Sequence, residues 1–136
     1  MDLQTWNTIN KYYQAFWEHF SSDKLTEIFD DKIEIHHAGR NESSHGIEEV
    51  LKTYKKHFFD SCVLDSTKLF DFRIQPHSDL HKISVSYTIR QINKLRGDGF
   101  GHCNEWFELT DDKKKIKKIT MISTFVVPET KKETKK

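Results

Sequence analysis

Residues 81–109 read HKISVSYTIRQINKLRGDGFGHCNEWFEL, and the pattern of these residues gives the clearest indication of the fold. Apolar and polar side chains alternate through residues 81–95, which is the period of a half-buried β-strand. Arg96-Gly97-Asp98-Gly99 follows, and an Asp-Gly pair between two strand-like runs is a hairpin signal. Residues 100–109 are strand-like again, so the stretch predicts two antiparallel strands joined by a tight turn.

The sequence on either side of this hairpin extends the predicted sheet. Residues 61–76 are rich in Leu, Phe and Ile and end at Pro76, which predicts a preceding strand. On the other side, Thr110-Asp111-Asp112-Lys113 is a turn, and residues 116–127 are strand-like once more. Because strands joined by short turns run antiparallel, the second half of the chain predicts a four-stranded antiparallel meander.

The first half of the chain has mainly helical periodicity. Apolar side chains, most of them aromatic, recur at steps of three and four from Trp6 to Phe20, which places one stripe on a helix. Asp2 is suited to cap this helix, because its side chain can accept hydrogen bonds from the first backbone amides. The predicted elements of this half are helices over residues 2–20, 25–29 and 46–59, a strand from Lys32 to the Ala38-Gly39 turn, and a polar loop over residues 39–46.

The predicted order of elements is α-α-β-α-β-β-β-β. This order defines an α+β fold with helices on one face of a curved, mainly antiparallel sheet, and such a sheet leaves a cavity between its concave face and the helices. At 136 residues the chain has room for one core. We therefore predict a single domain over residues 1–127, followed by a disordered Lys-rich tail over residues 128–136.

The distribution of charge and the hydropathy of the chain limit its possible binding partners and its cellular location. Residues 1–112 hold 13 Lys and Arg against 19 Asp and Glu, whereas residues 113–136 hold 9 Lys against 2 Glu. After Pro128 the basic residues alternate with Thr and Glu and no aromatic residue is present, so we expect no nucleic acid partner. Nowhere do eighteen apolar residues run together, and the N-terminus has no apolar signal core. We expect no membrane partner and a cytoplasmic location.

Familiar catalytic and cofactor motifs are absent from the sequence. Cys62 and Cys103 have no metal-ligand spacing, and two cysteines without a secretory signal do not indicate a disulfide. The sequence has no nucleophile elbow, no Gly-rich phosphate loop and no His-Glu-x-x-His helix. These absences argue against hydrolase, kinase and zinc protease functions, and we expect neither a cofactor nor a metal.

Glu105 is the most informative polar residue of the predicted sheet. It shares its strand face with Cys103, Phe107 and Leu109, so a carboxyl group lies in an otherwise apolar stripe. Burial raises the pKa of such a carboxyl, and a neutral carboxylic acid can donate a hydrogen bond to an oxyanion. The alternatives are an edge-strand glutamate that reaches solvent, and one paired with Arg90 of the neighbouring strand.

The other candidate site residues are two histidines and two tyrosines. His36 and His37 end the first predicted strand, so one ring points inward and the other outward. An inward imidazole titrates near neutral pH and suits a general base, and the alternative is a histidine hydrogen-bonded within the core. Tyr13 belongs to the inward stripe of the first helix and Tyr12 flanks it. A buried hydroxyl needs a hydrogen-bond partner, which a pocket would provide.

Four segments carry a resemblance to a known family. Residues 30–39, DDKIEIHHAG, resemble the pattern D-D-x-hydrophobic-x-hydrophobic-H/D-x-P-G of the ketosteroid isomerase and SnoaL-like branch of the nuclear transport factor 2-like superfamily. Residues 46–51, GIEEVL, resemble the start of its third helix. Residues 105–109 and 115–119, EWFEL and KIKKI, resemble its last two strands. The resemblance extends over roughly residues 5–127 and implies a cone-shaped fold with one pocket.

The resemblance also implies roles for individual residues. Ketosteroid isomerases end the first strand with a carboxylate general base, and His36 stands at that place here. A tyrosine of the first helix donates to the developing oxyanion, which corresponds to Tyr12 or Tyr13. A carboxylic acid on the penultimate strand is the second donor, which corresponds to Glu105. The chain differs from the family by His in place of the base, Ala38 in place of proline, and Glu in place of the usual Asp.

Two functions of different classes follow. The first is a cofactor-independent isomerase, cyclase or dehydratase acting on a small hydrophobic carbonyl compound, with His36 as base and Tyr13 and Glu105 as donors to the enolate oxygen. The second is a non-catalytic module of the same fold that binds a ligand or a partner. The side chains expected to line the pocket are Trp17, Tyr54, Tyr87, Phe107 and Met121.

The expected assembly is a homodimer formed through the outer face of the sheet. Trp106 places a large apolar group on the strand face away from the helices, together with His102 and Asn104. Exposed apolar patches of this kind usually mark interfaces, and a shared patch favours a symmetric pair.

Overall fold

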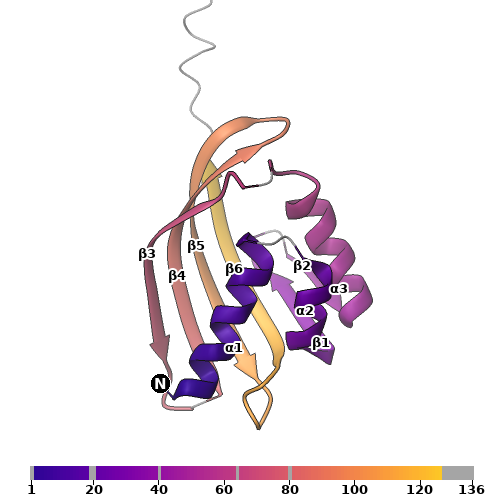
Figure 1. Ribbon diagram of the computed structural model, residues 1–136, viewed down its shortest axis with the longest axis vertical. Coiled ribbons are helices and arrows are strands. Elements are labelled where there is room, and N and C mark those ends of the chain that lie inside the picture. Colours follow the sequence, from indigo (N-terminus) through magenta and orange to yellow (C-terminus); the bar gives the residue numbers. More distant parts are fainter. Residues whose placement is uncertain (1, 19–20, 40, 64, 80, 127–136) are drawn as a thin grey trace, which may run out of the picture.

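The computed structural model describes residues 2–18, 21–39, 41–63, 65–79 and 81–126 (Figure 1). The helical elements are α1 (Leu3–Tyr13), η1 (Gln14–Glu18), α2 (Ser22–Ile28), α3 (Ile47–Tyr54) and η2 (Lys55–Phe59). The strands are β1 (Phe29–His37), β2 (Glu42–His45), β3 (Lys68–Pro76), β4 (Lys82–Asn93), β5 (Gly97–Leu109) and β6 (Ile116–Val126). The predicted α+β class is confirmed. The predicted tail over residues 128–136 and the predicted domain end at residue 127 lie outside the described residues.

The described strands form one curved sheet in the order β2-β1-β6-β5-β4-β3. Strands β3 to β6 pair antiparallel in sequence order, as the meander predicts, and β1 pairs antiparallel with β2. β1 and β6 are parallel, so the sheet is mixed. The long strands curve around α1, while α3 lies beside β1 and β2 (Figure 1). The helices therefore cover the concave face of the sheet.

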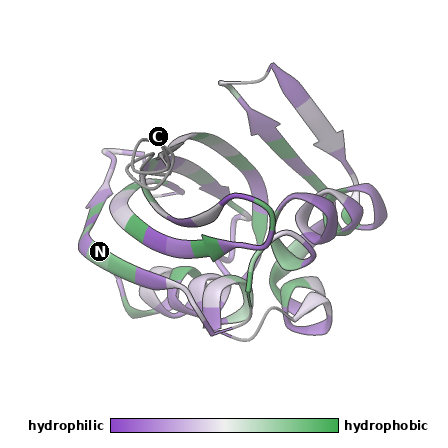
Figure 2. Cartoon of the chain, turned by 90° about the horizontal axis from the view of Figure 1, so that it is seen from above, coloured by the Kyte–Doolittle hydropathy of each residue, from purple (hydrophilic) through white to green (hydrophobic). Residues whose placement is uncertain are grey.

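The core fills the space between the concave face and the helices. Along β4 and β5 every second side chain is buried, and Figure 2 shows the resulting alternation of hydrophobic and hydrophilic bands on the strands. Aromatic residues supply much of the core, which compensates for an apolar content of only 35%. The bulkiest fully buried rings are those of Tyr12, Phe16, Phe29, Tyr54, Tyr87 and Phe107.

The predicted polar loop over residues 39–46 is wrong in part, because it contains strand β2. This strand reads Glu-Ser-Ser-His and pairs with β1 from Glu34 to His37. It lies at the edge of the sheet and buries only Ser44, so its sequence has no apolar alternation to reveal it. Edge strands in general need few apolar residues, because much of their surface faces water.

Two other predicted boundaries differ from the structure. The strand predicted over residues 61–76 begins only at Lys68, and Cys62 forms a single isolated bridge with Asn93. Phe29, predicted to belong to the second helix, is the first residue of β1 and is fully buried. Both differences arise because pairing with distant segments decides where a strand starts, and local periodicity does not record that pairing.

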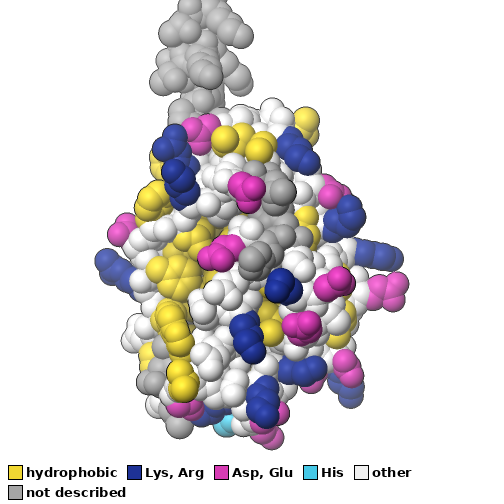
Figure 3. All heavy atoms as spheres, in the orientation of Figure 1, with side chains coloured by type: hydrophobic (Ala, Val, Ile, Leu, Met, Phe, Trp, Pro, Cys, Tyr) yellow, Lys and Arg dark blue, Asp and Glu magenta, His cyan; other side chains and the backbone are white. Residues whose placement is uncertain are grey.

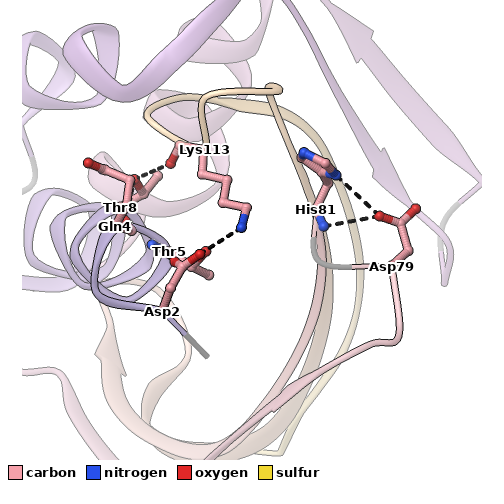
Figure 4. A network of polar contacts seen from close by, with 7 residues as sticks. All are labelled: Asp2, Gln4, Thr5, Thr8, Asp79, His81 and Lys113. Carbon is pink, nitrogen blue, oxygen red and sulfur yellow. Dashed lines mark hydrogen bonds and ion pairs between the residues drawn. The ribbon is translucent and has the colours of Figure 1, made fainter.

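The N-terminus of α1 is attached to the β5–β6 turn by a polar network (Figure 4). Asp2 caps the helix as predicted, accepting a hydrogen bond from the Thr5 amide at 2.8 Å. The Lys113 ammonium donates to the other Asp2 oxygen at 2.6 Å, and the Thr8 hydroxyl donates to the Lys113 carbonyl at 2.6 Å. The hydrogen bond from Lys113 holds the pKa of Asp2 well below its usual range. This network positions α1 across the concave face.

No helix among the described residues is long and apolar enough to cross a membrane.

Candidate functional site

A cavity of about 180 Å³ lies between the helices and the concave face of the sheet. It is smaller than the roughly 300–1,000 Å³ typical of drug-sized ligand sites, so it suits a small ligand. Larger hollows exist, such as one of about 430 Å³ between β2 and α3, but that one has polar and charged walls and no buried titratable group. The 180 Å³ cavity does contain such a group, because Glu105 lines it.

The helix side of the cavity is built by two π-helical turns. Phe16 and Trp17 come from η1, and His57 and Phe58 come from η2. A π turn inserts an extra residue into a helix and redirects the side chains that follow, and such turns are frequent at functional sites. Phe16 and Trp17 are adjacent in sequence, yet both are buried and their rings stack with centroids 4.0 Å apart. The π turns thus direct four rings into one wall.

Glu105 lies on β5 with only 3% of its surface exposed. It occupies the buried strand face together with Cys103, Phe107 and Leu109, as the alternation predicts. The Tyr13 hydroxyl donates a hydrogen bond to Glu105 Oε1. Burial raises the pKa of Glu105 to about 7, and hydrogen bonds from Tyr13 and Tyr87 partly oppose this increase. The carboxyl therefore exchanges its proton near neutral pH.

The tyrosines around Glu105 can act only as neutral hydrogen-bonding groups. Burial, followed by the nearby Glu105 carboxyl, raises the pKa of Tyr13 and of Tyr87 well above the ordinary value. The Trp17 indole N–H donates to the Tyr87 hydroxyl at 3.2 Å, so the single Tyr87 proton is available for the hydrogen bond to Glu105. Trp17, Tyr87, Glu105 and Tyr13 thus form one connected polar group within an aromatic wall.

The structure divides the predicted pocket residues into two groups. Trp17, Tyr87, Met121 and Glu105 line the cavity. Tyr54 and Phe107 were expected to line it, but they are not among the residues of its wall and are at most 1% exposed. Both are packed against Tyr12 instead: the Phe107 ring lies 5.3 Å from the Tyr12 ring, and the Tyr54 hydroxyl is 2.6 Å from that of Tyr12.

Tyr13 donates a hydrogen bond to Glu105 and, like Tyr54 and Phe107, is not among the residues of the cavity wall. It borders a separate hollow of about 260 Å³ between α1 and β3. Figure 3 shows hydrophobic side chains gathered along the side of the molecule where α1 and β3 lie. The hydrogen-bond partner of the Tyr13 hydroxyl in this structure is Glu105.

His36 is not the inward histidine, contrary to the prediction. Ile33, Ile35 and His37 share the buried face of β1, and His36 faces the other way. Its Nδ1 is 2.9 Å from the Ser43 hydroxyl of β2. His37 is 6% exposed, with its ring 6.3 Å from those of His57 and Phe58, but neither His36 nor His37 lines the cavity.

Sequence reasoning missed several residues of the cavity. His57 lines the cavity, and its spacing of three from Tyr54, which places it next to the apolar stripe of α3, is a signal that could have found it. Arg96 was read only as part of a turn. Gln91 and Asn93 also line the cavity. They could have been predicted, because every second side chain of β4 points inward and this alternation continues from Ile89 to both residues.

The two cysteines also line the cavity and both are free thiols. Burial raises the pKa of Cys62 to about 11 and that of Cys103 to about 12. They therefore remain protonated at neutral pH and are poor nucleophiles. Among the described residues, no group of three or more His, Cys, Asp or Glu side chains is placed to hold a metal ion.

No family model matches the sequence. No curated protein matches it either. Solved structures do match. A proposed polyketide cyclase from Xanthomonas campestris superposes with a TM-score of 0.72 at 12% identity, covering 88% of this chain and 89% of its own. A proposed ketosteroid isomerase from Kribbella flavida gives 0.66 at 12% identity, covering 89% and 78%. A proposed SnoaL-like polyketide cyclase from Shewanella denitrificans gives 0.68 at 9% identity, covering 90% and 92%.

These similarities, at such low identity, establish the fold. The chain has the cone-shaped α+β fold of nuclear transport factor 2-like proteins. The solved structures that share this fold include ones described as SnoaL-like and as ketosteroid isomerase, the same branch that the sequence segments resemble.

Proposed function

We propose that this protein is an enzyme that moves a proton on a small carbonyl compound held in the 180 Å³ cavity. The observation that supports this function is the buried Glu105 carboxyl in the cavity wall, whose pKa is raised to about 7. A general acid or base is most effective when its pKa lies near the working pH. The apolar and aromatic surroundings fit a substrate that is itself largely apolar.

The geometry suggests a division of labour between three residues. The ionised Glu105 takes a proton from the carbon next to the substrate carbonyl, which forms an enolate, and then returns it to another atom of the substrate. The Tyr87 hydroxyl, itself accepting a hydrogen bond from Trp17, donates to the ionised Glu105 before the transfer and to the enolate oxygen once Glu105 carries the proton. Tyr13 is a positioning residue, because its hydroxyl holds one Glu105 oxygen and leaves the other for the substrate.

This assignment replaces the base expected from the family pattern. His36 lies on the wrong face of β1, so the proposed base is Glu105 itself. Proteins described as polyketide cyclases and as a ketosteroid isomerase share the fold, and chemistry on carbonyl compounds in those proteins supports the reaction class proposed here. No resident cofactor is needed for a proton transfer of this kind, since one carboxyl group can both accept and return the proton.

The proposal is tested by proton exchange into deuterated water. We expect the protein to accelerate loss of the α-proton NMR signals of small cyclic ketones such as cyclohexanone. The rate should rise with pH as the Glu105 carboxyl ionises and level off above its pKa of about 7. If no small ketone in a panel exchanges faster than with heat-denatured protein, the proposed function is wrong.

A partner-binding role of the same fold is favoured by one separate observation. On the outer face of the sheet, Phe100, Trp106 and Ile122 are 51%, 39% and 40% exposed. Trp106 and Ile122 are close neighbours, because β5 and β6 pair with Asn104 opposite Ile122. Apolar side chains exposed in this way usually mark an interface.

We therefore expect a homodimer formed through this outer face. Light scattering at a protein concentration of about 50 µM should give twice the mass of the chain, 32 kDa rather than 16.2 kDa. Trp106→Glu should shift the protein to monomer, because a charge at the centre of an apolar interface is costly to desolvate. Glu108→Gln, on the same face, serves as the control. A wild-type monomer at this concentration would contradict the expectation.

A further inference from the structure

Glu105 is the only carboxyl group among the described residues that line the 180 Å³ cavity. None of the described Lys and Arg side chains forms an ion pair with it. Arg96 also lines the cavity, but Glu105 pairs with Val85, and the turn that holds Arg96 begins after Asn93, eight residues further along β4. Eight residues span about 26 Å at the usual rise of a strand, so the charge of Arg96 lies far from the carboxyl.

The Glu105 carboxylate has accepting capacity that the described residues do not fill. The Tyr13 and Tyr87 hydroxyls donate hydrogen bonds to it, whereas a carboxylate can accept about four. Both donors are neutral, because burial raises the pKa of each tyrosine well above the ordinary value. An ionised carboxylate that is 3% exposed and has only neutral partners is costly to desolvate, and a cation beside it would offset that cost.

The wall around this carboxyl suits a cation with an apolar body. The rings of Phe16, Trp17, Phe58 and Tyr87 line the cavity. The Trp17 indole is hydrogen-bonded to the Tyr87 hydroxyl, which in turn contacts Glu105, so two of these rings adjoin the carboxyl. A positive charge within about 6 Å of an aromatic ring centroid is attracted by the ring, and more strongly where water is excluded. The wall thus offers one anionic group beside several apolar rings.

We propose that this cavity binds small apolar ammonium ions, with the ammonium group hydrogen-bonded to Glu105 and the hydrocarbon part packed on the aromatic wall. A primary ammonium has three N–H donors, which can fill the accepting capacity of the carboxylate, whereas a quaternary ammonium has none. The site does not depend on the proton-transfer function, although a bound ammonium ion would compete with a ketone for Glu105.

Binding should depend on pH, because the ammonium ion requires an ionised Glu105. Burial raises the pKa of this carboxyl to about 7, and aliphatic amines stay charged over this range, like the lysine side chain with its pKa of about 10.4. Below pH 7 the ligand must displace a proton from Glu105. Its dissociation constant should therefore rise about tenfold for each pH unit, until the preference over an uncharged ligand is lost.

The titratable groups that face Glu105 from the packed elements are of two kinds. Four tyrosines and one thiol remain protonated between pH 5 and pH 8, because burial raises their pKa values: Tyr12 and Tyr13 of α1, Tyr54 of α3, Tyr87 of β4 and Cys103 of β5. His57 of η2 lines the cavity, and histidine as a residue type titrates in this range. Both the wild type and Glu105→Gln contain His57, so the difference between them reports on Glu105 alone.

The test compares cyclohexylammonium with cyclohexanol, which has a similar shape and no charge. Titration calorimetry at pH 8 should show the ammonium ion binding about tenfold more tightly than the alcohol, and the two affinities should converge as the pH falls to 5. Glu105→Gln should remove the preference by weakening the ammonium ion, and its retained binding of the alcohol shows that the variant is folded. The control Glu108→Gln removes a carboxyl from the opposite face of β5 and should keep the preference.

The outcomes separate this site from the proposed function. Equal affinities for the two probes at pH 8 overturn the inference, and so does a failure of both to bind. A preference that persists in Glu105→Gln also overturns it, because the cation then binds elsewhere, and an equal loss in both variants indicates general attraction by negative charge. If the ammonium ion binds through Glu105 but no ketone exchanges its α-protons, the cation site stands and the proton-transfer function fails.

Discussion

Replacing Glu105 with glutamine is expected to slow proton exchange of a ketone substrate by about 100-fold or more, because general acid–base catalysis typically contributes factors of this size. Glutamine has the same shape and its carbonyl can still accept the hydrogen bond from Tyr13. It cannot take up a proton at neutral pH. The variant should therefore fold and bind ligand while losing the reaction.

The control for this variant is Glu108→Gln on the same strand. Glu108 is only partly buried and lies on the opposite face of β5 from Glu105. The Glu108→Gln variant should therefore exchange substrate protons at the rate of the wild type. Circular dichroism and thermal unfolding at pH 5 verify that both variants are folded. A Glu105→Gln protein with more than about a tenth of wild-type activity would show that another group transfers the proton.

Between pH 4.5 and pH 8, the free energy of unfolding should fall further in the wild type than in the Glu105→Gln variant. The expected difference between the two decreases is about 3 kcal/mol. Folding raises the pKa of Glu105 from 4.5 to about 7, and each unit corresponds to roughly 1.4 kcal/mol. The folded state therefore holds this proton more tightly than the unfolded state. Its contribution is fully present below pH 4.5 and is lost as the pH rises through 7.

Urea unfolding at fixed protein concentration over this pH range measures the effect. Other groups that titrate in the same window do so in both proteins, so the difference between the two curves isolates Glu105. At pH 5 the two free energies of unfolding should be similar, and at pH 8 the variant should be the more stable. Parallel curves would mean that the Glu105 pKa is close to its ordinary value when folded.

Much of the candidate site follows from strand alternation alone. Glu105 lies on the same face as Cys103 and Phe107, and this face packs on α1, so its burial was predictable from spacing. The same rule places His37 with Ile33 and Ile35, which the structure confirms. His36, the position that the family pattern implies for the base, lies on the other face, because side chains in an extended strand change face at every residue.

Other parts of the site could not be read from the sequence. The π turns η1 and η2 interrupt helices whose apolar spacing is compatible with an uninterrupted α-helix. Arg96, in the turn between β4 and β5, lines the cavity, and nothing in the neighbouring sequence indicates this. Tyr54 has the spacing of a pocket residue, but its hydroxyl meets Tyr12 from α1, 42 positions earlier.

The α+β class, the antiparallel meander and the inward face of Glu105 could all be predicted from the sequence. These features depend on the period of side chains along one segment and on the turns that join neighbours. Only the tertiary structure decided the parallel pairing of β1 with β6, the edge strand β2, and which rings line the cavity. Each of these depends on residues far apart in the chain, whose contacts are selected by the packing of the whole core and leave no periodic trace in either segment.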